Sequence, residues 1–168
     1  MIIFSVYLSM STPCINNNHQ HCIESALQRA EKVCRESGAR FTAARRRVLE
    51  LIWQNHHVVS AYDLLAQLQK DDPSAKPPTV YRALDFLLEQ GLIHRVSSMN
   101  AFTRCDCRHE SSDFQLMICS GCKRVQEIHI PDLPESLKQY AQSQNFKTSG
   151  AIVEIHGLCQ HCQPVQTD

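Results

Sequence analysis

The sequence lacks a net charge, an internal repeat, a low-complexity tract and a hydrophobic run long enough to cross a membrane. Its 17 basic and 17 acidic side chains balance, so the charge total by itself points to no class of partner. A length of 168 residues allows one medium domain or two small ones. The hydrophobic fraction of 43% and the mean hydropathy of −0.30 are typical of a soluble globular protein.

The apolar N-terminal run, MIIFSVYLSM, reaches only about half the length of a membrane span. It lacks the basic residues that begin a secretory signal, and no A-x-A cleavage site follows it. We therefore expect residues 1–20 to be a disordered N-terminal extension, translation to start at Met10, and the protein to be cytoplasmic. In this region disorder is preferred over a third metal site for four residues of ligand type: Cys14, His19, His21 and Cys22.

Helical patterns dominate the first half of the chain. An apolar stripe at helical spacing runs from His21 to Ser37 and is closed by Gly38. Thr42 is a candidate N-cap for a second helix. A third helix is predicted to begin after Ser60, since Asp63 follows three residues later as in a capping box.

A fourth helix is predicted over Lys76–Gly91, because its two prolines suit a first turn and its glycine suits a C-terminal cap. Two short β-prone runs follow, Leu92–Val96 and Ala101–Arg104. These elements predict a winged helix-turn-helix DNA-binding domain over residues 21–97, with Lys76–Gly91 as the recognition helix. A hinge is expected over residues 98–112.

The second half has a different pattern, which predicts a small α+β domain over residues 113–168. Strands are expected at Phe114–Ile118, Val125–Ile130 and Phe146–His156, with a helix at Pro134–Gln144. The expected fold class is therefore α+β, with a winged helix-turn-helix domain followed by a small α+β domain clipped together by zinc.

The nine cysteines carry the most specific signal in the sequence. Four of them form two C-x-x-C pairs, Cys119/Cys122 and Cys159/Cys162, which are separated by 36 residues. A C-x-x-C turn aims two thiolates at one point, and two such turns complete a tetrahedral zinc shell. A redox motif would not explain two copies, and an odd cysteine total does not suit a disulfide framework. A closed structural zinc site is therefore predicted, and such a site has no open position for catalysis.

DNA contacts are suggested by two groups of residues. Arg82 can form paired hydrogen bonds to guanine, and Tyr81 can reach a phosphate or a thymine methyl group. Arg45 and Arg46 belong to a basic run that suits phosphate contacts. An ordinary solvated helix face explains each group equally well in isolation, but their position in a helix-turn-helix frame favours DNA binding.

Several motifs together resemble the ferric uptake regulator family, and within it the branch of zinc-responsive regulators. They are Thr42-x-x-Arg45-x-x-Val48, Ser60-Ala-Tyr-Asp-Leu-Leu65, KPPTVYRALDFLLEQG over residues 76–91, the two C-x-x-C pairs, and Glu154-Ile-His-Gly-Leu-Cys159. The similarity runs from about Ala26 to Gln163. The long motif at residues 76–91 is highly specific, whereas the basic run is not.

The resemblance implies a homodimer whose C-terminal domain dimerises and whose winged-helix domain binds double-stranded DNA. The expected targets are palindromic AT-rich operators of zinc-uptake genes, repressed when zinc is bound. Contacts from Thr79, Tyr81 and Arg82 are expected on the bases, and from Arg45 and Arg46 on the backbone. Two Zn²⁺ per protomer are expected, one structural and one regulatory.

The resemblance also implies the ligands of the regulatory zinc: His94, Cys105, His109 and Glu127. The segment 104–113 departs from the family pattern, since His109 lies closer to Cys105 than expected. Three neighbours could therefore replace it as ligand: Asp106, Cys107 and Asp113. A thiolate in this set favours zinc over iron or manganese.

Three other functions agree less well with the sequence. The H-x-E and P-C-x-x-C signatures of zinc deaminases are absent from the sequence, so we expect no enzyme of that kind. A zinc-ribbon interaction module would leave the motif at residues 76–91 unexplained. A sensor of iron, manganese or peroxide within the same family is the nearest alternative, and Cys105 is the feature against it.

Overall fold

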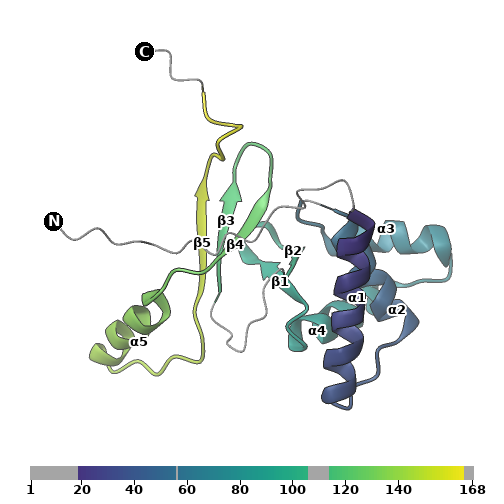
Figure 1. Ribbon diagram of the computed structural model, residues 1–168, viewed down its shortest axis with the longest axis horizontal. Coiled ribbons are helices and arrows are strands. Elements are labelled where there is room, and N and C mark those ends of the chain that lie inside the picture. The colour runs from purple at the N-terminus through teal and green to yellow at the C-terminus, as the bar shows by residue number, and fades with distance from the viewer. Residues whose placement is uncertain (1–18, 56, 106–113, 165–168) are drawn as a thin grey trace.

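The computed structural model describes residues 19–55, 57–105 and 114–164, which form four helices and a two-stranded wing, followed by a three-stranded sheet with one helix (Figure 1). The fold is α+β, as the sequence predicts. The predicted start site and the disorder of residues 1–18 lie outside the described residues. Within the described ranges, no helix is long and apolar enough to cross a membrane.

The first four helices form the N-terminal half of the chain, and local sequence features mark several of their ends. Their bounds are α1 His19–Glu36, α2 Ala43–Gln54, α3 Ala61–Asp71 and α4 Pro77–Glu89. The predicted N-caps are confirmed, because the side chains of Thr42 and Ser60 accept hydrogen bonds from the backbone of Arg45 and Asp63. Gly91 follows α4 with a φ of +61°, a left-handed conformation that glycine adopts without strain.

The core of this half is a single apolar cluster. Its largest fully buried side chains come from the facing stripes of α2, α3 and α4 and from the residues after α4: Leu49, Leu51, Ile52, Leu64, Leu84, Leu87, Leu92 and Ile93. The helix α1 closes the cluster with the small residues Ala26 and Ala30, which allow a close helix approach. This packing leaves one face of α4 directed to solvent.

The wing is an antiparallel pair of strands, β1 (Ile93–Val96) and β2 (Ala101–Arg104). The short 3-10 helix η1 (Ser97–Met99) joins them. The pairing corrects the predicted hinge of residues 98–112, because β2 is hydrogen-bonded into the wing. The winged-helix half of the chain therefore extends at least to Arg104.

The start of α1 also corrects the sequence interpretation. The helix begins at His19, so the predicted disordered extension does not reach residue 20. His21 and Cys22 lie on the same helix rather than in a disordered segment. The apolar stripe on this helix continues to Ile23, which is buried in the core and explains why the N-terminal turn is ordered.

The second half contains a sheet of strand order β4-β3-β5, with β3 at Phe114–Cys119, β4 at Val125–Ile128 and β5 at Ile152–Gly157. The helix α5 (Leu133–Ser143) provides the crossover that a parallel β3–β5 pair requires, and it lies at the end of the molecule away from α1–α4 (Figure 1). The predicted strand Phe146–His156 begins too early, because β5 pairs with β3 only from Ile152 onward.

The two halves meet along the wing. Val96 of the wing is buried with Leu116 and Ile118 of β3 in a second apolar cluster. An isolated antiparallel bridge also joins His57 to Arg124, the residue that precedes β4. The sheet therefore packs against the winged-helix half through both side chains and backbone.

Candidate metal centres and DNA-binding face

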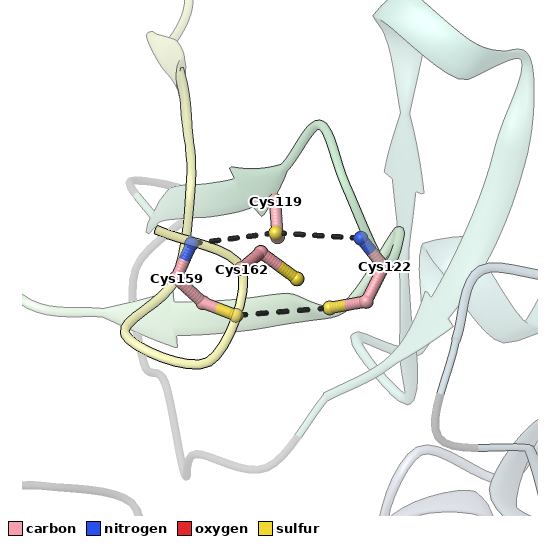
Figure 2. Close-up of side chains that lie close together, drawn as sticks. All are labelled: Cys119, Cys122, Cys159 and Cys162. Carbon is pink, nitrogen blue, oxygen red and sulfur yellow. Dashed lines mark hydrogen bonds between the residues drawn. The ribbon is translucent and has the colours of Figure 1, made fainter. Parts of the chain in front are cut away.

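The four cysteines of the two C-x-x-C pairs lie together at the end of the sheet. Figure 2 shows their sulfurs converging from the turn after β3 and the turn after β5. All four sulfurs lie within 4.8 Å of one another, and those of Cys122 and Cys159 are 3.8 Å apart. Tetrahedral zinc with thiolate bonds of about 2.3 Å requires sulfur separations of about 3.8 Å. The cysteines therefore fit a structural zinc ion.

Backbone geometry in the two turns supports the same conclusion. The amides of Cys122 and Cys159 donate to the sulfur of Cys119 at 3.5 and 3.3 Å. Gly121 lies so close to Cys162 that an added Cβ would be 3.0 Å from the Cys162 sulfur. A side chain at this position would therefore crowd Cys162, and glycine leaves room for the two turns to approach each other.

The pKa values of the thiols show what the cluster favours. Hydrogen bonds from the backbone of Cys159 and Cys122 lower the pKa of Cys119 to about 6. Hydrogen bonding with the three neighbouring thiols instead raises the pKa of Cys162 to about 12. The surrounding protein groups thus favour a negative charge on Cys119 and disfavour one on Cys162, and a divalent cation bound by both sulfurs would offset the unfavourable charge on Cys162.

A second cluster joins the two halves of the chain. It consists of His94 in β1, Cys105 immediately after β2, and Glu127 in β4, whose ligand atoms lie within 4.8 Å of one another. The Nε2 atom of His94 is 3.1 Å from Oε1 of Glu127, and the two side chains are only 7% and 2% exposed. Cys105 is equally buried, at 2%. A nitrogen, a sulfur and an oxygen donor in one dry site match the ligands that zinc accepts.

Two neighbours position this second cluster. The ring of Phe114 lies against that of His94, with centroids 3.9 Å apart. Arg29 of α1 donates to the backbone carbonyl of Cys105 at 2.5 Å and also lies over the Trp53 ring. No sequence signal predicted this role for Arg29, because 76 residues separate it from the carbonyl that it contacts.

The fourth predicted ligand, His109, lies outside the described residues, as do its possible replacements Asp106, Cys107 and Asp113. The structure thus brings together three of the four ligands expected for the regulatory site. Among the described residues, the two groups above are those whose His, Cys, Asp or Glu atoms converge as a metal site requires. His21 and Cys22, two adjacent residues of α1, belong to neither of these two groups.

The candidate DNA-contacting residues divide into two kinds. On α4, Tyr81 and Arg82 are exposed and Thr79 is half-buried, so all three are accessible on the solvent face of the predicted recognition helix. The arginines of α2 already make contacts within the chain. Arg45 lies 3.5 Å from the centroid of Phe86, and Arg46 forms an ion pair with Glu31.

Comparisons with known proteins agree with this architecture. The model of the ferric uptake regulator family matches residues 36–156. The zinc uptake regulation protein of Escherichia coli (strain K12) is 39% identical over 144 residues, covering 85% of this chain and 84% of that protein. The chain belongs to the ferric uptake regulator family.

Two further comparisons define its neighbours within the family. A solved structure of a zinc uptake regulator complexed with zinc and DNA superposes with a TM-score of 0.80 and is 38% identical, covering 83% of this chain and 94% of that one. The peroxide operon regulator of Bacillus subtilis (strain 168) is 31% identical over 136 residues, covering 81% of this chain and 92% of that protein. The family resemblance inferred from the sequence is therefore confirmed.

Proposed function

We propose that the protein is a zinc-responsive transcriptional repressor that binds palindromic AT-rich operators of zinc-uptake genes in its zinc-bound state. It acts in the cytoplasm, as a homodimer, and without catalytic activity. The single observation that carries the proposal is the buried cluster of His94, Cys105 and Glu127, which links the DNA-binding half to the sheet. The likeness to a regulator solved with zinc and DNA supports the same reading.

The two metal centres have different tasks. Cys119, Cys122, Cys159 and Cys162 hold a structural zinc that ties the turn after β3 to the turn after β5. His94, Cys105 and Glu127 hold the regulatory zinc, together with His109, which lies outside the described residues. A thiolate ligand selects zinc over iron and manganese at this site.

Regulation follows from where the regulatory ligands are attached. His94 belongs to the wing and Glu127 to the sheet, while Cys105 begins the connection between them. A zinc ion, when bound, supplies ligand bonds that tie these segments to one point. The orientation of the DNA-binding half is then fixed before the protein binds the operator. Because metal binding offsets the entropic cost of ordering the two halves, this cost no longer lowers the affinity for DNA.

DNA recognition is assigned to the solvent face of α4. Thr79, Tyr81 and Arg82 contact base edges in the major groove, with Arg82 suited to guanine. Arg45 and Arg46 contact phosphates. Both arginines have partners within the free chain: Arg45 lies over the Phe86 ring, and Arg46 is paired with Glu31. To contact a phosphate, Arg46 must therefore give up its ion pair with Glu31.

A second copy of the chain is assigned to the face of the sheet that points away from the wing. Met117 and Ile155 are register partners on that face and are 39% and 41% exposed. Leu158, which follows β5, is 45% exposed. An exposed apolar group of this kind is typical of an interface, and a two-fold dimer would space two α4 helices for successive major grooves.

A mobility-shift assay tests the proposed function. The purified protein is mixed with duplexes selected from a random pool, with and without a zinc chelator, and with iron, manganese or zinc restored. We expect the chelator to abolish DNA binding and the addition of zinc, but not of iron or manganese, to restore it. Restoration by iron or manganese, or loss of binding on peroxide treatment, would instead favour the alternative suggested by the peroxide operon regulator.

A further inference from the structure

One cross-strand row of the sheet faces the wing. In the register of the sheet, Leu116 of β3 pairs with Glu127 of β4 on one side and with Glu154 of β5 on the other. Paired residues in neighbouring strands project to the same face, so these three side chains form a line across the sheet. The line has a carboxylate at each end and an apolar residue in the middle.

Each member of this row meets a successive part of the wing. Glu127 lies 3.1 Å from His94, and Leu116 is buried in a cluster with Val96. The carboxylate of Glu154 accepts hydrogen bonds from the backbone amides of Ser97 at 2.6 Å and Ser98 at 3.2 Å. The row therefore contacts the wing through two carboxylates, those of Glu127 and Glu154. Only Glu127 belongs to the regulatory metal cluster.

The contact made by Glu154 is strong for its kind. Its side chain is only 12% exposed, and both of its oxygens accept backbone hydrogen bonds, which are stronger when the acceptor is charged. Burial acts to raise the pKa of Glu154, but hydrogen bonds from Ser98 and Ser97 and the nearby His156 outweigh it and leave the pKa below its ordinary value. The group is therefore ionised at neutral pH.

We infer that Glu154 is a positioning residue that anchors the wing to the sheet through Ser97 and Ser98. This role rests on the proposed function, because it concerns the geometry that zinc stabilises. With Glu154 in place, the far end of the wing is already held when the regulatory ion binds. Only the end of the wing at His94 and Cys105 then remains to be ordered when an ion is bound, so the Glu154 contact would contribute to the affinity for both zinc and DNA.

The test compares Glu154→Gln with the unsubstituted protein and with Glu135→Gln, a control on the exposed surface of α5. Affinity for the exchangeable zinc is measured by competition with a chromophoric chelator. DNA affinity is measured with a duplex selected by the zinc-loaded protein. We expect Glu154→Gln to lower both affinities by about tenfold, the difference between a charged and a neutral hydrogen bond. Glu135→Gln should change neither.

Three results decide the inference. A positioning role is supported if Glu154→Gln keeps the zinc bound by the four cysteines but binds both the exchangeable zinc and DNA more weakly, by similar factors. Unchanged affinities accompanied only by a lower Tm would overturn it, since Glu154 would then merely stabilise β5. Failure of the unsubstituted protein to bind DNA in response to zinc would refute the proposed function itself.

A milder variant covers the case in which Glu154→Gln does not fold. Glu154→Asp keeps the charge but withdraws the carboxylate by one methylene group from the amides of Ser97 and Ser98. It should lower both affinities as well, and wild-type values in this folded variant would also overturn the inference.

Discussion

Replacing Cys105 by serine removes one ligand from the regulatory cluster while leaving the four-cysteine site intact. Cys105 is 2% exposed, and its sulfur lies within 4.8 Å of the ligand atoms of His94 and Glu127. Structural zinc sites contribute about 10–16 kcal/mol in total, or roughly 3 kcal/mol per ligand. Cys105→Ser should therefore weaken the exchangeable zinc by about a hundredfold, since a neutral hydroxyl is a poor substitute for a thiolate.

The effect on DNA follows from coupling between the two sites. Allosteric coupling energies are typically about 1–3 kcal/mol, so losing the regulatory zinc should lower operator affinity by about 5- to 150-fold. Fluorescence anisotropy with a labelled duplex measures this at fixed salt, with zinc buffered to a level that saturates the unsubstituted protein. By reciprocity, bound DNA should tighten the zinc affinity of the unsubstituted protein by the same factor.

The matched control for this experiment is Cys34→Ser. Cys34 is also 2% exposed but lies in α1, in neither metal cluster. Its substitution should reduce stability without changing the zinc dependence of DNA binding. Equal operator affinity of Cys105→Ser and the unsubstituted protein would refute the regulatory site, and an equal loss in Cys34→Ser would show that the effect is general destabilisation.

Four further substitutions test the other assignments. Arg82→Ala should relax base preference at one operator position at a cost of about 1–3 kcal/mol. Arg46→Ala should instead weaken binding to all duplexes alike and reduce the dependence of log affinity on log salt concentration by about 1. Titrations of matched and mismatched duplexes at several salt concentrations measure both effects. Cys159→Ser should release the structural zinc and unfold the sheet, measured by metal analysis and thermal melting. Met117→Asp should dissociate the dimer in sedimentation experiments, because it places a charge on the exposed apolar face.

Each of these predictions has a contrary result. Uniform weakening by both arginine variants would make α4 a backbone-binding helix rather than a recognition helix. A folded, zinc-loaded Cys159→Ser would show that the cysteines are not the structural site. A dimeric Met117→Asp would move the interface to another surface.

Local chemistry made most of the fold predictable. The caps at Thr42 and Ser60 and the glycine at residue 91 mark helix ends that depend only on neighbouring residues. The start of β5 was harder, since a strand begins where its partner offers backbone groups, and β3 offers them to β5 only from Ile152. The predicted hinge overlaps β2: the sequence marks Ala101–Arg104 as β-prone, but only the pairing with β1 shows that these residues belong to the wing.

The sites show the same division between local and long-range information. The four-cysteine site is predictable from the sequence, because each C-x-x-C turn directs its two thiols toward one point. The ligands of the regulatory cluster were identified by family resemblance, since nothing in their spacing brings β1 and β4 together. The contacts of Arg29 with Cys105 and of Glu154 with Ser97 depend on how distant elements pack, so only the structure reveals them.

Zinc content per protomer, measured together with operator binding during stepwise chelation, tests the division between a structural and a regulatory metal most directly. Two ions should be present at first, and mild chelation should remove one, abolishing operator binding while the thermal melt of the sheet persists. Restoring one equivalent of zinc should restore binding. A single ion per protomer, or operator binding that persists after the first ion is lost, would contradict the account.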